Sequence, residues 1–265
     1  MTKALRSHWP EYLIEAAGLG LFMISACFFT ALFEHPASAV HHAFPDPALR
    51  RILNGIAMGL TAIGIIYSPW GKQSGAHINP SVTLAFFRLG KVAPWDAFFY
   101  VLSQFVGGLA GVLIAAAAAR QFVAHPAVDY VTTVPGPNGP SVAFAAELVM
   151  SLVLMTVVLT VSNTQRLARF TGLFAGTLIA IYISLEAPLS GMSLNPARTF
   201  GSALPAHLWT SLWIYFTAPP LGMLLAAQVY LWRNGRSSVA CAKLHHQNSH
   251  RCIFCHYHLG KRPVS

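Results

Sequence analysis

Charged residues are scarce in this sequence of 265 residues. Asp, Glu, Lys and Arg together make up 9% of the chain, whereas 55% of the residues are hydrophobic. Soluble domains carry roughly 25% charged residues. The shortage excludes an ordinary soluble protein and predicts a polytopic membrane protein. The formal net charge is +9, which we interpret as the basic character of cytoplasmic loops and not as a nucleic-acid-binding surface.

Cysteine is also rare, and the positions of the four cysteines do not suit a disulfide framework. Cys27 lies in a long apolar segment, whereas Cys241, Cys252 and Cys255 lie in the C-terminal tail. The apolar segments contain no nucleophile, metal-ligand cluster or phosphate-binding loop. We therefore expect neither an enzyme nor a resident cofactor.

Six long apolar segments dominate the rest of the sequence. Each is close to the ~20 residues that a transmembrane helix needs, although the second is short. An all-α membrane protein follows, with spans at Tyr12–Phe33, Ile52–Ser68, Trp95–Ala119, Ser141–Asn163, Ala168–Ala187 and Trp209–Trp232.

The basic residues predict the orientation of these spans. If both termini are cytoplasmic, thirteen Lys and Arg residues lie inside and four lie outside, at Arg50, Arg51, Arg120 and Arg198. This asymmetry agrees with the positive-inside rule. We place the protein in a plasma membrane, with a bacterial inner membrane as the expected setting.

Two short motifs interrupt the apolar pattern at matching places. Ser74-Gly-Ala-His-Ile-Asn79-Pro80-Ser81 follows the second span, and Ser190-Gly-Met-Ser-Leu-Asn195-Pro196-Ala197 follows the fifth. Asn caps a helix well, and Pro suits the first helical position. Each motif therefore opens a helix of about ten residues, roughly 15 Å long, which is half of the ~30 Å hydrocarbon layer.

Other landmarks occur in the same order in both halves. Each half contains a glutamate in its first span, a Gly-x-x-x-Gly pair in its second, and a Phe followed by a Gly in its third: Glu15, Gly55, Gly59, Phe105 and Gly111, then Glu147, Gly172, Gly176, Phe216 and Gly222. Because three spans per repeat is an odd number, the second repeat must be inverted. Inverted repeats place their site near the midplane, at broken helices.

The paired motifs, the run Asn195-Pro-Ala-Arg-Thr-Phe-Gly201 and the two span glutamates resemble the major intrinsic protein family of aquaporins and glycerol facilitators. The resemblance covers about residues 10–232. It implies six tilted spans plus two re-entrant half-helices, one pore per subunit, and a homotetramer. We divide the chain into a cytoplasmic N-terminus (1–10), a channel domain (11–232, with repeats at about 11–119 and 141–232) and a disordered cytoplasmic tail (233–265).

The two motifs predict how the pore works. The half-helices, which start at Asn79-Pro80-Ser81 and Asn195-Pro196-Ala197, direct their positive ends at the midplane. If the asparagine oxygens cap the helices, the amide N–H groups can donate to water in the lumen. Such donors and dipoles let water pass and repel protons and cations.

An arginine at bilayer depth usually faces a cavity, and the resemblance places Arg198 at the outer constriction. The resemblance adds Met58, Ile183 and Met192 by spacing. Members of this family that conduct only water typically carry histidine at the position of Ile183, so Ile183 speaks against strict water selectivity. Two other positions speak against a glycerol facilitator: the Tyr215-Phe216 pair is aquaporin-like, and Thr199 stands where glycerol facilitators carry an acidic residue. The substrate marks therefore disagree.

Glu15 and Glu147 are buried carboxylates with two interpretations. They either accept N–H groups of the re-entrant loops or relay protons, and we favour the first because lipid offers the loop backbone no partners. His77 is interpreted in the same way, as a side chain that braces its loop, with a pH-dependent gate as the alternative.

The tail contains Cys252, Cys255, His256 and His258, which could hold zinc in a Cys2His2 arrangement. We favour a tail that binds metal only adventitiously and therefore predict no metal site, because the His spacing fits no standard zinc finger; metal-dependent gating is a hypothesis.

The sequence thus predicts a passive channel for water, together with small neutral solutes. One alternative is a channel mainly for glycerol, ammonia or neutral metalloid hydroxides. Another is a non-conducting structural or adhesive membrane protein.

Overall fold

The computed structural model describes residues 1–255, apart from the side chain of Arg236, and these residues form helices and no strands. Six helices are long and apolar enough to cross a membrane. They are α1 (Thr2–Glu34), α3 (Pro47–Tyr67), α6 (Pro94–Val123), α7 (Pro140–Ser162), α8 (Thr171–Ser190) and α10 (Leu212–Asn234). The shorter helices are α2 (Ala39–Ala43), α4 (Pro69–Ser74), α5 (Pro80–Arg88) and α9 (Pro196–Ala206), with 3-10 turns at Asp129–Val131, Ala168–Phe170 and Arg236–Ser238. The six predicted spans are therefore confirmed.

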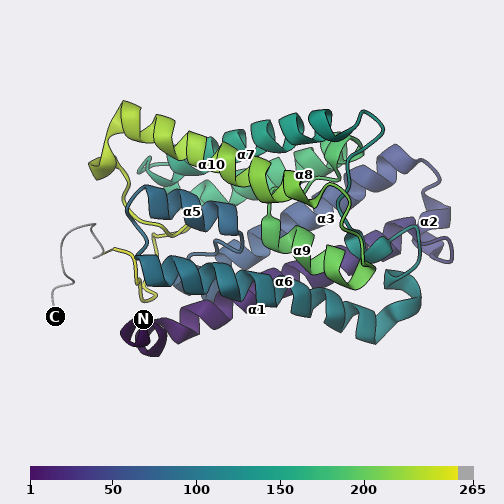
Figure 1. Cartoon of the computed structure of the whole chain (residues 1–265), viewed down its shortest axis with the longest axis horizontal. Coiled ribbons are helices and arrows are strands. Elements are labelled where there is room, and N and C mark those ends of the chain that lie inside the picture. Colours follow the sequence, from purple (N-terminus) through teal and green to yellow (C-terminus); the bar gives the residue numbers. More distant parts are fainter. Residues whose placement is uncertain (256–265) are drawn as a thin grey trace.

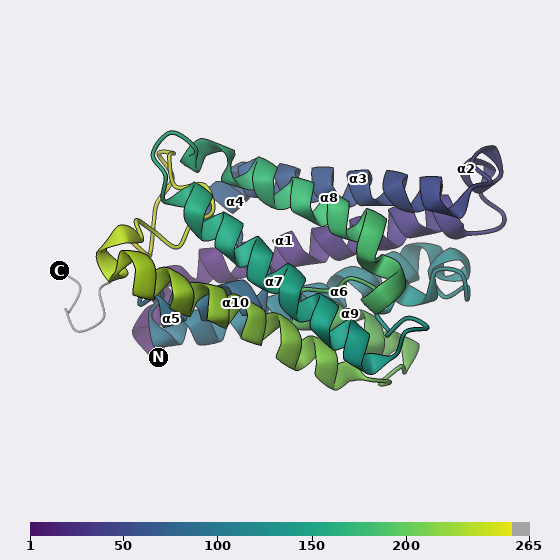
Figure 2. The same ribbon diagram turned by 90° about the horizontal axis from the view of Figure 1, so that it is seen from above.

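The long helices form a bundle around the two short helices α5 and α9. Figure 1 shows α5 in the half of the bundle that carries the N-terminus and α9 in the opposite half. The end of α10 lies at the same end as the start of α1, as an even number of spans requires. In Figure 2, α3 lies beside α8, and α7 lies beside α10. The third close pair, α1 with α6, is the counterpart of α7 with α10 in the other repeat.

Small residues set the spacing of α3 and α8. A Cβ atom on Gly59 would lie 2.6 Å from the carbonyl oxygen of Gly176, and one on Gly55 would lie 2.6 Å from that of Ala180. These distances are too short for any side chain. The Gly-x-x-x-Gly pairs thus bring the two helices into backbone contact, as such motifs do in membranes.

Both half-helices begin as the motifs predict. Pro80 and Pro196 occupy the first helical position, and Asn79 and Asn195 are the N-caps. The helices are 9 and 11 residues long. Each therefore reaches only about halfway across a bilayer.

Some helix limits differ from the apolar segments. Helix α1 begins at Thr2 and not at Tyr12, and α3 begins at Pro47 and not at Ile52. Hydropathy detects only the part of a helix that contacts lipid, and both helices continue into polar sequence. At α3 the side chain of Asp46 caps the first turn by accepting the N–H of Ala48 at 2.9 Å.

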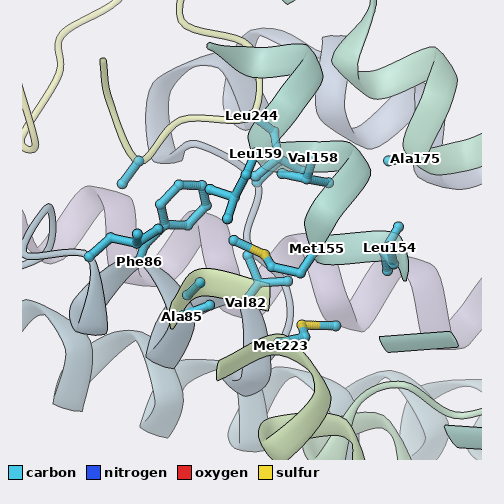
Figure 3. Close-up of a cluster of buried hydrophobic side chains, with 14 of the residues drawn as sticks. Val82, Ala85, Phe86, Leu154, Met155, Val158, Leu159, Ala175, Met223 and Leu244 are labelled. Atoms are coloured by element: carbon cyan, nitrogen blue, oxygen red, sulfur yellow. The ribbon is translucent and has the colours of Figure 1, made fainter. Parts of the chain in front are cut away.

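The tail departs from the expected disorder. Residues 239–255 pack against the bundle, with Val239, Ala242, Leu244 and Phe254 buried. These apolar side chains join a core cluster with residues of α5 and α7, and Figure 3 shows Leu244 next to Leu159 and Val158. The burial of these side chains against apolar residues of the bundle accounts for the ordered tail. His256 and His258 lie outside the described residues.

Candidate functional site

The two Asn-Pro motifs meet and hold each other. The side-chain oxygen of Asn79 accepts the N–H of Ser81 at 2.8 Å, and that of Asn195 accepts the N–H groups of Ala197 and Arg198 at 3.0 and 3.2 Å. The amide nitrogen of Asn79 donates to the carbonyl of Leu194 at 2.8 Å. The helix caps are therefore formed by oxygen, and the nitrogen of each amide is directed away from its own helix.

The second asparagine repeats this arrangement in reverse. The amide nitrogen of Asn195 donates to the carbonyl of Ile78 at 2.8 Å. Each bond uses one of the two N–H groups of its amide. Because both residues line the same cavity and are 7% exposed, the second N–H group of each can serve a molecule in that cavity.

Glu15 organises the first re-entrant loop. Its carboxylate accepts the Ser74 hydroxyl at 2.8 Å and the N–H groups of His77 and Ile78 at 3.1 and 2.6 Å. Ile78 has a φ of +40°, a left-handed conformation that is unfavourable for a β-branched residue. The hydrogen bonds from Glu15 hold this strained backbone in place.

Glu147 does the same for the second loop. It accepts the Ser190 hydroxyl at 2.8 Å and the N–H groups of Ser193 and Leu194, both at 2.7 Å. Leu194 has a φ of +57°. Because the carboxylate is the acceptor in all three contacts, the contacts are those of an anchor for the loop. The same holds for Glu15, so the geometry supports the loop-bracing interpretation.

Two buried tyrosines complete the anchors, and sequence reasoning missed both roles. Tyr100 donates its hydroxyl to the carbonyl of Ser74 at 2.7 Å, and Tyr215 donates to that of Ser190 at 2.5 Å. Each bond satisfies the end of a helix that stops inside the bundle. In the sequence, Tyr215 stands out only as part of the Tyr215-Phe216 pair. Tyr100 lies five residues before Phe105, the residue that matches Phe216 in the other repeat. The two tyrosines therefore do not align when the repeats are compared, and their shared role is not visible from the sequence.

His77 braces the first loop from both sides. Its Nδ1 lies 3.1 Å from the Thr83 hydroxyl, and its Nε2 donates to the carbonyl of Ala242 at 2.7 Å. The ring stacks on Phe86 and Phe254, with centroids 5.2 and 5.5 Å away. In the second loop, the Ser193 hydroxyl is hydrogen-bonded to the Thr199 hydroxyl, as the His77 ring is to Thr83 in the first loop.

A single cavity of about 340 Å³ passes both asparagines. Its lining extends from Leu244, at the end that carries the tail, to Asn54 and Thr132 near the opposite end. A water molecule occupies about 30 Å³ of liquid. The cavity is therefore large enough for a file of waters, and both repeats contribute to its wall.

The four residues predicted for the constriction all line this cavity: Met58, Ile183, Met192 and Arg198. Three of them are apolar. The Nη1 of Arg198 is buried and has no hydrogen-bond partner within residues 1–255. A buried guanidinium nitrogen without a partner is costly unless it binds something in the cavity, so Arg198 can donate to water or to a solute hydroxyl.

The tail candidates are only partly brought together. Cys252 and Cys255 lie side by side, but the residues that join them are Cys241 and His246. The proposed partners His256 and His258 lie outside the described residues. Sequence reasoning grouped the ligands by proximity along the chain and so passed over Cys241, the first of the three cysteines of the tail.

Comparison with known proteins agrees with this geometry. A family model described as "Major intrinsic protein" matches residues 4–230. Aquaporin NIP2-1 of Zea mays is 38% identical over 233 residues, which are 87% of this chain and 75% of the relative. Aquaporin NIP6-1 of Arabidopsis thaliana is 34% identical over 200 residues, 75% of this chain and 63% of the relative.

A probable NIP-type aquaporin of Nicotiana alata is 34% identical over 177 residues, 66% of this chain. The chain thus spans less than two thirds of the length of two of these relatives, 63% in each case. The solved aquaglyceroporin of Plasmodium falciparum has the same fold, with a TM-score of 0.68 at 21% identity, covering 84% of this chain and 96% of that one. The chain therefore belongs to the major intrinsic protein family of membrane channels.

Proposed function

We propose that this chain is a passive channel that conducts water, together with small neutral solutes, and excludes protons and ions. The observation that carries the proposal is the pair of crossed asparagines beside one cavity. Both amides present nitrogen to the cavity because both oxygens are used as helix caps.

Proton exclusion follows from this polarity. A water between Asn79 and Asn195 receives hydrogen bonds through both lone pairs, so it cannot accept a proton from its neighbour in a file. The positive ends of α5 and α9 meet at the same place and repel hydronium and other cations. The asparagines and the dipoles thus oppose proton transfer together.

A second candidate, conduction mainly of glycerol, ammonia or neutral metalloid hydroxides, is favoured by the apolar constriction. Met58, Ile183 and Met192 supply no side-chain donor beside Arg198. A solute with a carbon skeleton can contact these side chains while its hydroxyl binds the guanidinium. We keep water as the first proposed substrate because the cavity passes both asparagines, whose amide nitrogens can donate to it.

The assembly and its setting are proposals as well. We propose a homotetramer in a plasma membrane, with both termini cytoplasmic. If both termini are cytoplasmic, thirteen of the seventeen Lys and Arg residues lie on the cytoplasmic side, and this asymmetry supports the proposed orientation. The relatives named above are plant proteins, so the bacterial setting stays a prediction.

Stopped-flow light scattering on proteoliposomes tests the proposal. We expect osmotic water permeability well above that of protein-free vesicles, and its loss in Ile183→Trp, because the indole fills the cavity. Ile181→Trp is the matched control, since Ile181 is 42% exposed on the outer surface of the same helix. Wild-type permeability at the lipid background would refute a water channel, and swelling in glycerol alone would favour the second candidate.

A further inference from the structure

Four potential metal ligands converge in the tail. Within residues 1–255, the ligand atoms of Cys241, His246, Cys252 and Cys255 all lie within 4.8 Å of one another. The Sγ of Cys241 is 3.4 Å from that of Cys252 and 3.7 Å from that of Cys255. The Sγ of Cys255 is 3.6 Å from the ring nitrogens of His246.

These separations of 3.4–3.7 Å are close to those of a tetrahedral zinc site. Bonds of 2.3 Å to sulfur and 2.0–2.1 Å to nitrogen give ligand separations of about 3.8 Å between sulfurs and about 3.6 Å between sulfur and nitrogen. A disulfide would need about 2.05 Å, and Cys241 is nearly equidistant from its two sulfur neighbours. Three thiolates and one imidazole form one of the usual donor sets of structural zinc.

Lys243 adds an independent argument, because it is a buried cation in the same segment. It is 2% exposed, and its Nζ donates to the carbonyls of His250 and Arg251 at 3.4 and 2.5 Å. No carboxylate of residues 1–255 lies at ion-pair distance from it. A buried charge needs a counter-charge, and a zinc ion with three thiolates carries a net charge of −1.

The segment around the cluster reaches both repeats. Leu244 donates its N–H to the carbonyl of Gly75 at 3.1 Å, and Ala240 donates to the side chain of Asn163 at 2.7 Å. Arg251 pairs with Glu11 of α1 at 3.3 Å. Between these contacts, the side chain of Leu244 lines the cavity itself.

We propose that Cys241, His246, Cys252 and Cys255 bind one Zn²⁺, and that this ion fastens residues 239–255 over the tail-side mouth of the cavity. Binding releases three protons, one from each thiol, while the imidazole binds in its neutral form. The ion closes a loop of 15 residues whose apolar members cover the first re-entrant loop. It thereby holds Leu244 at the mouth.

Metal titration of the purified full-length protein tests the site. After removal of metal with a chelator, we expect one equivalent of Co²⁺ to produce the thiolate charge-transfer and tetrahedral absorption bands, and Zn²⁺ to abolish them. Cys241→Ser and His246→Ala should each weaken binding at least 100-fold, because the loss of outer-shell partners alone costs about 10–100-fold. His250→Ala is the matched control, an exposed histidine of the same segment that should bind as the wild type does.

Two results would overturn the site: no stoichiometric tetrahedral binding by the wild type, or Cys241→Ser binding with wild-type affinity. The second part of the proposal rests on the proposed water conduction. We expect chelation to raise the water permeability of wild-type proteoliposomes at least twofold, zinc to reverse the rise, and Cys255→Ser to be insensitive to both. Wild-type water permeability that is above background but equal with and without zinc would overturn the closure at the mouth. Permeability at the lipid background in both states would instead refute the water channel, and the zinc site would then be judged by the metal titration alone.

Discussion

The substitution Glu147→Gln tests how the second re-entrant loop is held inside the membrane. The carboxylate accepts three hydrogen bonds, from Ser190, Ser193 and Leu194. Glutamine has nearly the same shape but offers one oxygen and one NH2 group, so at least one donor of the loop must face another donor. A rotation of the amide by 180° does not help, because donors surround both ends.

The expected loss can be estimated bond by bond. One buried N–H without a partner costs about 1–3 kcal/mol, and the two remaining bonds each weaken by about 1 kcal/mol when the acceptor loses its charge. The total of about 3–5 kcal/mol corresponds to a fall in Tm on the order of 10 °C. Tyr215→Phe removes one neutral hydrogen bond to the same loop and should cost only about 1 kcal/mol.

Both variants should be measured by thermal unfolding in detergent and by water permeability in vesicles. Glu147→Gln should also conduct less water, because Met192 and Arg198 lie on the loop and helix that it holds. Equal Tm values for Glu147→Gln and Tyr215→Phe would refute the reasoning, since a neutral acceptor would then be as good as a carboxylate.

Four further substitutions test the helix contacts and the pore. Gly59→Ala should lower the stability of the protein by about 1–3 kcal/mol, because its Cβ would meet the carbonyl of Gly176. Gly64→Ala is the control: its Cβ would enter open space, so it should raise stability by up to about 1 kcal/mol. Equal shifts in Tm for the two variants would contradict the packing of α3 against α8. Arg198→Ala should increase permeability to neutral solutes larger than water, and an unchanged ratio of solute to water flux would count against its role. Asn195→Ala should cost about 1–2 kcal/mol as a lost cap and admit a proton leak, which a pH-sensitive dye inside vesicles would report.

The core of the site was predictable because its signals are local. A cap such as Asn195 and the proline that follows it specify the start of a helix within two residues, and the glutamates stand out as charges in apolar spans. The same is true of Arg198. Each of these residues carries a local signal of this kind, which is why the chain order alone was enough to nominate it for the site.

The tail was not predictable for the opposite reason. Its order depends on contacts between residues far apart in the chain, such as His77 with Ala242, 165 positions later. Cys241 and His246 also have no regular spacing to Cys252 and Cys255 that would group them. A short segment that mixes apolar and polar residues without a regular period resembles a disordered one until the surface that receives it is known.

The crossed asparagine bonds have a consequence for biogenesis. Asn79 requires a backbone oxygen 115 residues further along the chain, and Asn195 requires one 117 residues earlier. At a synthesis rate of about 5–20 residues per second, roughly 6–23 s separate the emergence of the two halves. During that time the side-chain amide of Asn79 lacks its backbone acceptor, so the N-terminal repeat cannot reach its final structure in the membrane until the C-terminal repeat has been inserted.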